Sequence, residues 1–270
     1  MSLTRLDISL EAYEIGLSGA VPDRKDWSEP AMDRGILEFV ALFSGIVFKY
    51  GGRIVHGCHP TFTPVILRQA RLQAGNRLRR PVTLVMSDLW AQDFRPEDIE
   101  SMTDVAEFVV TRKFGDGGPS DVSTRNRSLS AMRRVLIDAQ NVMVAVGGKM
   151  HSADGIVPGV AEELALADKK GLPRFLIGGL GGLARKLAKG LTPSDLKNSL
   201  PQKANVTLFG THDVSACVNV LFEHFAFSKA LSESALQPVK WNPGLRVILD
   251  HRDGTIDSEA TQNILRADVA

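Results

Sequence analysis

Residues 142–148 read VMVAVGG, and residues 174–182 read RFLIGGLGG. In each stretch a short apolar run ends at a pair of glycines. Strands that are covered on both faces lose the alternation of polar and apolar residues, and glycine permits a tight turn into the next element. The two stretches therefore predict buried strands at residues 142–146 and 174–177, each followed by a glycine turn.

The rest of the chain repeats this alternation of short apolar runs and longer segments of helical period. Further strands are expected at residues 13–17, 53–55, 82–86 and 106–110. Helices are expected at residues 30–50, 63–73, 123–139, 159–170 and 182–188. Pro30 and Pro158 suit helix starts, and Gly51 and Gly171 suit left-handed helix ends. The pattern predicts an α/β fold, with a parallel sheet flanked by crossover helices.

The region after about residue 191 departs from this pattern. It holds a connector (191–205), an apolar run VTLF (206–209), a helical stretch (213–225) and a polar tail from about residue 252. We expect residues 1–200 to form the main domain and residues 201–270 to form an α/β appendage that completes it. An independent second domain is the alternative.

Composition excludes several classes of protein. The chain has 270 residues, 44% of them hydrophobic, and 32 basic against 31 acidic side chains. These values are typical of a globular protein and give no general field for a nucleic acid or an anionic membrane. Two cysteines are too few for a disulfide framework, and no signal peptide or membrane-length apolar run is visible. We expect a cytoplasmic protein with no nucleic-acid or membrane partner.

The glycine pairs after the predicted strands indicate a ligand site. In parallel α/β sheets the ligand lies beyond the carboxyl ends of the strands, where glycine lets backbone N–H groups approach an anion. Tight turning alone is the alternative explanation. Residues 179–184 fit G-x-G-x-x-A, but no acidic residue follows at the spacing that a dinucleotide-binding dehydrogenase needs. No P-loop occurs either.

Three other groups of residues have a possible chemical role. Residues 16–20 nearly form the G-x-S-x-G element of serine hydrolases, but Ala20 replaces the last glycine. His56, Cys58 and His59 offer metal-ligating atoms without an identifiable fourth partner, so we expect no metal site. Arginines gather on the helix at 123–139, and two carboxylates open the helix at 159–170: Arg125, Arg127, Arg133, Arg134, Glu162 and Glu163.

These motifs together resemble the SLOG superfamily, which is named for the Smf (DprA) DNA-processing proteins and the LOG phosphoribohydrolases. The resemblance rests on GGRIVHGCHPT (51–61), RNRSLSAMRR (125–134), AVGG (145–148), PGVAEELALA (158–167) and FLIGGLGG (175–182). It is greatest with bacterial SLOG domains that stand alone or are fused to TIR or sirtuin modules. It implies a Rossmann-like fold in residues 1–200 that binds a nucleotide or an ADP-ribose-derived molecule.

The LOG enzymes carry P-G-G-x-G-T-x-x-E, and the match to this motif is partial. Gly147 and Gly148 match the glycine pair, Gly159 matches the next glycine, and Glu163 matches the glutamate. Residues 149–158 stand where the enzymes have one residue, and Val160 replaces the phosphate-binding threonine. The LOG enzymes also use an arginine upstream of this motif, which would correspond here to either Arg127 or Arg133.

We therefore expect a nucleotide-binding protein, with signal sensing in bacterial stress or antiphage defence as its role and no cofactor. The expected ligand-binding residues are His59, Thr61, Arg127, Arg133, Gly147, Gly148, Gly159, Glu163, Gly179, Gly181 and Gly182.

Two alternatives stay open. The first is an N-glycosidase, phosphoribohydrolase or deoxyribosyltransferase in which Glu163 and Arg133 are catalytic. The second is a purely structural or protein-interaction domain. The resemblance also implies a TIR or sirtuin-type partner and a homo-oligomer.

Overall fold

The computed structural model describes residues 9–23, 30–75, 79–151 and 157–227. These residues form a six-stranded sheet in which every neighbouring pair of strands is parallel. The strands are β1 (Glu14–Ala20), β2 (Arg53–His56), β3 (Val82–Ser87), β4 (Ala106–Thr111), β5 (Val142–Gly147) and β6 (Arg174–Ile177). All residues of β2, β3, β5 and β6 are buried, as their apolar runs predict.

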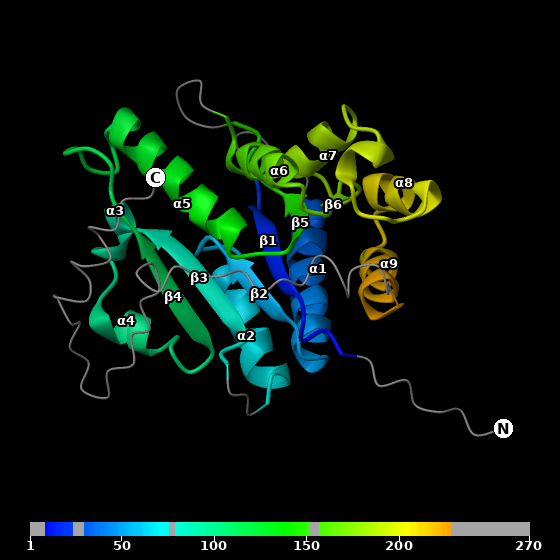
Figure 1. Cartoon of the computed structure of the whole chain (residues 1–270), viewed down its shortest axis with the longest axis horizontal. Coiled ribbons are helices and arrows are strands. Elements are labelled where there is room, and N and C mark those ends of the chain that lie inside the picture. The colour runs from blue at the N-terminus through cyan, green and yellow to red at the C-terminus, as the bar shows by residue number, and fades with distance from the viewer. Residues whose placement is uncertain (1–8, 24–29, 76–78, 152–156, 228–270) are drawn as a thin grey trace.

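Helices connect the strands and cover both faces of the sheet (Figure 1). The helices before β6 are α1 (Pro30–Lys49), α2 (Thr63–Gln73), α3 (Asp88–Ala91), α4 (Pro96–Glu100), α5 (Val122–Asp138) and α6 (Gly159–Lys170). Those after β6 are α7 (Gly182–Ala188), the 3-10 helix η2 (Pro193–Leu196), α8 (Gln202–Gly210) and α9 (Val214–Phe227). One core lies between the sheet and α1, α2 and α9, and a second lies between the sheet and α5, α6 and α7.

The strand order is β4-β3-β2-β1-β5-β6. The chain therefore builds outward from β1 in one direction through β4, and then continues on the other side of β1 with β5 and β6. The strands β1 and β5 are neighbours, but the chain leaves β1 toward α1 on one face of the sheet and leaves β5 toward α6 on the other face. In open α/β sheets a ligand-binding crevice forms at such a switch point. The α/β, Rossmann-like fold expected from the sequence is confirmed.

Polar residues occupy the opposite, amino-terminal end of the strands. The buried Arg53 guanidinium lies 2.9 Å from Glu14 and 3.1 Å from Glu107, and it also donates to Thr83 Oγ1. Burial raises the pKa of Glu14. Because its partners are all within the fold, this cluster joins β1 to β4 and is distinct from the crevice at the carboxyl ends.

The strand bounds differ slightly from those expected. Strand β1 begins at Glu14 and continues to Ala20 because Ser18, Gly19 and Ala20 pair with the end of β5. Helices α2, α6 and α7 have the expected bounds.

The C-terminal region departs more from expectation. The run VTLF lies inside helix α8, so the described part of the appendage, residues 201–227, is helical and contains no strand. Helix α8 packs on β6 and α9 packs on α1. The division into residues 1–200 and 201–270 stays a prediction. Among the described residues, no helix combines the length and the apolar character that crossing a bilayer requires.

Candidate functional site

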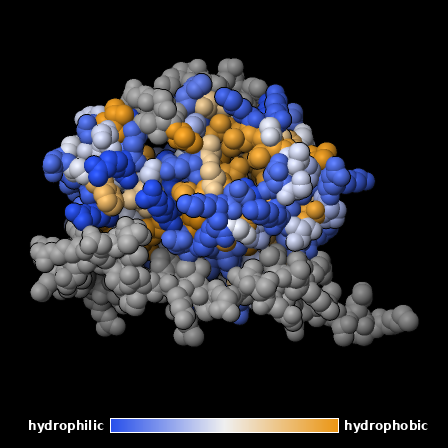
Figure 2. All heavy atoms as spheres, turned by 45° about the horizontal axis from the view of Figure 1, so that its top comes forward, coloured by the Kyte–Doolittle hydropathy of each residue, from blue (hydrophilic) through white to orange (hydrophobic). Residues whose placement is uncertain are grey.

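A crevice of about 400 Å³ lies where the strand order reverses. Its volume falls within the range of about 300–1,000 Å³ that is typical of small-molecule sites. The lining residues come from the ends of β1, β2 and β5, from α5 and from the start of α6. They include Ser18, Asp23, His56, His59, Leu129, Met132, Arg133, Gly148, Lys149, His151, Gly159, Val160 and Glu163. Figure 2 turns the top of Figure 1 forward, and apolar side chains gather there among hydrophilic ones.

The glycine turn after β5 brings the end of this strand against two neighbours. Gly147 and Gly148 have φ of 64° and 93°, in the left-handed region. A Cβ on Gly147 would lie 2.5 Å from the Ala20 carbonyl oxygen, and one on Gly148 would lie 2.7 Å from Val160. The Gly148 amide donates to the Ala20 carbonyl (2.7 Å). These glycines therefore set the width of the crevice, and the Gly148 N–H is already engaged.

Arg133 lies between two carboxylates on the wall of the crevice. Its Nη1 donates to Glu162 Oε2 (2.5 Å), and its Nε is 3.7 Å from Glu163 Oε1. A Cβ on Gly159 would lie 2.8 Å from Arg133 Nη2, so glycine at the start of α6 leaves room for the guanidinium. Glu162 and Glu163 neutralise the charge of Arg133. The guanidinium can therefore act as a hydrogen-bond donor in a fixed position, but it is not a free positive charge.

Glu163 is a carboxyl group in the crevice whose pKa is perturbed. Burial raises its pKa, and the nearby Arg133 opposes this effect only in part. Ser18 Oγ lies beside the carboxylate and also lowers its pKa, although it makes no hydrogen bond of regular geometry. A buried carboxyl group with a raised pKa beside an arginine is a common feature of functional sites.

Two histidines at the end of β2 are held as neutral rings. His56 Nε2 accepts a hydrogen bond from the His59 amide, so its Nδ1 carries the proton and donates to the Leu17 carbonyl (2.8 Å). His59 Nδ1 accepts from the Thr61 amide, which leaves Nε2–H as its donor. Burial lowers the pKa of both histidines, that of His59 to about 4.

The N-terminus of α6 opens on the crevice without a side-chain cap. Pro158 is the N-cap residue, and Gly159 and Val160 line the crevice. The first amides of a helix have no partner within it, and the helix dipole makes this end positive. Lys149 stands close by, and its Nζ is 3.3 Å from Asp23 Oδ1 in a half-exposed pair. Such a pair contributes little to stability and can be exchanged for a ligand.

The structure brings together some of the expected ligand-binding residues. His59, Arg133, Gly148, Gly159 and Glu163 line the crevice. Thr61 does not line the crevice but holds His59 in place. Its hydroxyl lies 2.9 Å from His59 Nδ1 and accepts a hydrogen bond from the Val21 amide. Gly147 forms the tight turn beside it.

Other expected residues lie elsewhere. Arg127 is exposed, with its guanidinium 6.0 Å from the Phe114 ring, and does not line the crevice. Gly179, Gly181 and Gly182 are also absent from the lining. A Cβ on Gly179 would meet the Thr211 carbonyl, and one on Gly182 would lie 2.6 Å from the Gly147 carbonyl carbon. These glycines let α7 and α8 pack against the ends of β5 and β6.

Sequence reasoning did not select several of the lining residues as site residues, among them Ser18, His56 and Lys149. Ser18 and His56 each lie at the end of a strand whose neighbours the local pattern does not reveal. Lys149 directly follows the glycine pair. Its position just after a predicted strand could have identified it as a site residue.

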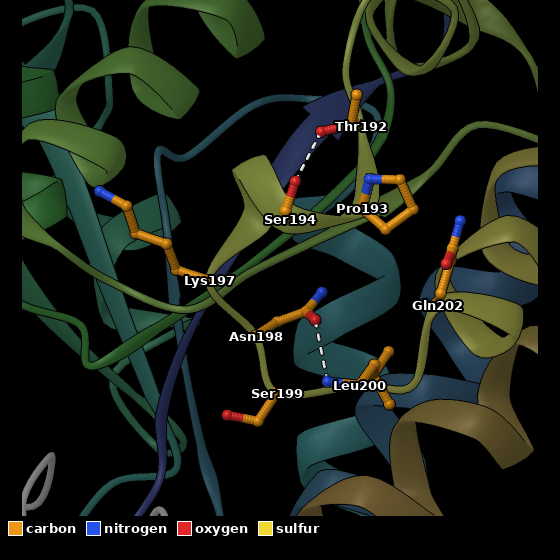
Figure 3. A pocket seen from close by; sticks show the side chains of 8 residues that line it. All are labelled: Thr192, Pro193, Ser194, Lys197, Asn198, Ser199, Leu200 and Gln202. Carbon is orange, nitrogen blue, oxygen red and sulfur yellow. Dashed lines mark hydrogen bonds between the residues drawn. The ribbon is translucent and has the colours of Figure 1, made fainter.

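A second hollow of about 430 Å³ lies at residues 192–202, shown in Figure 3. Its polar groups bind one another: Thr192 and Ser194 share a hydrogen bond, and Asn198 accepts from the Leu200 amide. Asn198 also donates to the carbonyl of Arg174, at the amino end of β6. This hollow is at the end of the sheet where ligands are not expected, so the crevice is the better candidate.

No group of three metal-ligating side chains occurs among the described residues. In the sequence cluster at 56–59, both ring nitrogens of His56 have hydrogen-bond partners. Burial raises the pKa of the Cys58 thiol to about 11, which disfavours the thiolate that a metal would need.

Fold and crevice together define a Rossmann-like α/β protein with a crevice of small-molecule size at its switch point. The family model described as SLOG cluster2 matches residues 87–233, which is more than half of the chain, and the chain belongs to this family. Among curated proteins nothing matches it. A solved structure titled as that of TM1055, a structural genomics target, covers 77% of this chain and 98% of its own, with 15% identity and a TM-score of 0.44.

Proposed function

We propose that the crevice binds a nucleotide, with its phosphate at the start of α6 and its ribose beside Glu163. The observation that carries this proposal is the meeting, at the switch point, of an uncapped helix N-terminus and a half-buried carboxylate–arginine pair. A phosphate needs the first feature, and a hydroxyl-rich sugar suits the second.

The phosphate end is formed by α6 and Lys149. The amides of Gly159 and Val160 supply donors, and Lys149 supplies a positive charge. Arg133 does not supply this charge, because it is paired with Glu162. His59 Nε2–H is a further donor on the β2 side. This arrangement replaces the hydroxyl that the LOG motif places at the position of Val160.

The sugar and the base fit the rest of the crevice. Glu163 and Ser18 offer an acceptor and a hydroxyl at its buried end, while Leu129 and Met132 on α5 give an apolar wall for a base. The volume of about 400 Å³ favours one nucleoside monophosphate over an extended dinucleotide. An ADP-ribose-derived ligand would place one of its two ribose phosphates here.

Calorimetric titration tests this proposal. AMP, GMP, CMP, UMP and ADP-ribose are titrated into the wild-type protein, Lys149→Ala and Lys169→Ala. At least one of these ligands should bind, and Lys149→Ala should weaken its binding about tenfold or more, since hydrogen bonds to charged groups contribute about 1.5–3 kcal/mol. Lys169, exposed at the far end of α6, is the control and should have no effect. No heat from any ligand would refute the proposal.

Cleavage of the N-glycosidic bond is a second candidate function, and the Arg133–Glu163 pair favours it. A buried carboxylate beside the sugar would stabilise the positive charge that develops on the ribose as the base departs. Chromatography of the bound nucleotide after incubation would detect free base and ribose 5-phosphate. Glu163→Gln should abolish the formation of free base while keeping most of the affinity for the nucleotide. A ligand that is bound but returned intact would leave binding as the function.

The biological role follows from which of these two functions holds. A protein that binds without cleaving suits a sensor of a nucleotide signal in bacterial stress or antiphage defence, coupled to a TIR or sirtuin-type partner. The resemblance of the sequence to SLOG domains that stand alone or are fused to TIR or sirtuin modules suggests this role. The same resemblance suggests assembly into a homo-oligomer, which size-exclusion chromatography with light scattering would measure.

A further inference from the structure

Ser18 has a buried hydroxyl that makes no hydrogen bond of regular geometry within the protein. The residue is 4% exposed, lies near the end of β1 and lines the crevice. Its Oγ interacts with the Glu163 carboxylate and lowers the pKa of that group, but the geometry is not that of a regular hydrogen bond. Buried polar groups are nearly always well paired, so a poorly paired hydroxyl that lines a crevice is available to a ligand.

The sheet pattern explains why Ser18 faces the ligand. Side chains alternate along a strand, so Ile15 and Leu17 enter the core beneath α1, whereas Gly16 and Ser18 face α5 and α6. Pairing of Ser18 with Ala145 of β5 fixes this register at the switch point. The hydroxyl thus lies at a rigid position, beside a carboxylate carried by a different element.

We infer that Ser18 and Glu163 together read the vicinal hydroxyls of a ribose, and that the crevice is therefore selective for ribonucleotides over 2′-deoxyribonucleotides. The inference rests on the proposed nucleotide site and names its sugar specificity. A carboxylate accepts from one hydroxyl, and Ser18 is able to donate to or accept from the other.

The selectivity follows from what a deoxyribose leaves unpaired. With only one sugar hydroxyl at this end, Glu163 would keep Arg133 as its partner, but Ser18 Oγ would stay buried without a well-formed hydrogen bond. A site that is built to bind a hydroxyl discriminates strongly against an analogue that lacks it. Ser18 therefore determines which sugar binds, and it takes no part in bond cleavage.

The experiment compares each of AMP, GMP, CMP and UMP with its 2′-deoxy counterpart by calorimetry, on the wild-type protein, Ser18→Ala and Ser44→Ala. The wild type should bind the ribose form at least about tenfold more tightly. Ser18→Ala should weaken ribonucleotide binding, leave deoxyribonucleotide binding nearly unchanged, and so narrow the ratio to a few-fold. Ser44 is the matched control, because its hydroxyl is also buried and unpartnered but lies in α1, outside the crevice.

The outcomes separate the two claims. Equal affinities for the ribose and deoxyribose forms in the wild type would overturn the specificity inference and leave the nucleotide site standing, and this comparison needs no variant to fold. A ribose preference that survives in Ser18→Ala would remove Ser18 from the assignment. Failure of every ribonucleotide and deoxyribonucleotide to bind would contradict the nucleotide site itself, and the inference with it.

Discussion

Glu163 is a residue whose position costs stability at neutral pH. Burial raises its pKa, so the folded protein holds the proton more tightly than the unfolded chain does. The stabilisation from that proton is present at acidic pH and is lost as the pH rises through the folded-state pKa. A charged carboxylate at this position is consistent with selection for ligand binding rather than for stability.

Glu163→Gln should therefore be more stable than the wild type near pH 7. The expected rise in Tm is a few degrees, since about 1 kcal/mol corresponds to about 2–4 °C for a protein of this size. The difference should shrink as the pH falls through the raised pKa of Glu163 in the folded protein, and it should be gone below the usual pKa of a glutamate. Differential scanning calorimetry at several pH values measures this, and a lower Tm for the variant at neutral pH would argue against the assigned role of burial.

Local sequence could identify some site residues and not others. The spacing of Gly147, Gly148, Gly159 and Glu163 follows from one strand, one turn and one helix start, which are readable in order along the chain. The contribution of Ser18 depends on β1 lying beside β5, which is a matter of topology. The charge balance of Arg133 depends on Glu162 being in reach, which only the packing of α5 on α6 decides.

At the scale of the elements, the start of α7 fits against the glycine turn of β5. Gly182 has φ of 65°, and a Cβ there would lie 2.6 Å from the Gly147 carbonyl carbon, which is backbone and cannot rotate away. The Leu183 amide donates to the Gly148 carbonyl (3.1 Å), so α7 and the turn form one unit. Glycine is required at position 182 for both its conformation and its size.

Gly182→Ala should destabilise the protein by at least about 2 kcal/mol, through positive-φ strain and overlap with backbone. It should also disturb the crevice, because the turn sets its width. Gly190→Ala is the control: its nearest neighbour, the Leu187 carbonyl oxygen, is 3.7 Å away, so little change is expected. Urea unfolding of the two variants compares them, and equal midpoints would contradict this account of the packing.

Element bounds were predictable where punctuation was strong. Helix α6 runs from Gly159 to Lys170 as expected, because Pro158 precedes it and Gly171 ends it in the left-handed conformation. The structure of the run VTLF was not predictable, because a short apolar run suits a strand or a buried helix equally. The run is helical because, as part of α8, it packs against β6, and this tertiary contact cannot be read from the local sequence.

At the scale of the whole molecule, three histidines make the fold sensitive to acid: His56 is buried, and His59 and His224 are half-buried. Burial lowers the pKa of His56, and it lowers those of His59 and His224 to about 4. The unfolded chain takes up these protons near pH 6.5, whereas the folded protein resists them, so stability is lost as the pH falls from about 6.5 toward 4. The raised pKa values of Glu14 and Glu163 oppose this trend in part.

The urea midpoint should therefore be lower near pH 5 than near pH 7. His224→Phe should reduce this difference, since His224 packs against Phe175 and Phe225 outside the crevice, where a phenyl ring is an apolar replacement. Denaturation curves at the two pH values measure the effect. A pH dependence that is the same in the variant would show that His224 does not contribute to acid sensitivity.

A crystal structure with the tightest-binding nucleoside 5′-monophosphate bound tests the central claim most directly. Our account predicts the phosphate at the amides of Gly159 and Val160 near Lys149, and the ribose hydroxyls against Ser18 and Glu163. A nucleotide found in the hollow at residues 192–202, or one in the crevice with its phosphate at Glu163, would contradict it.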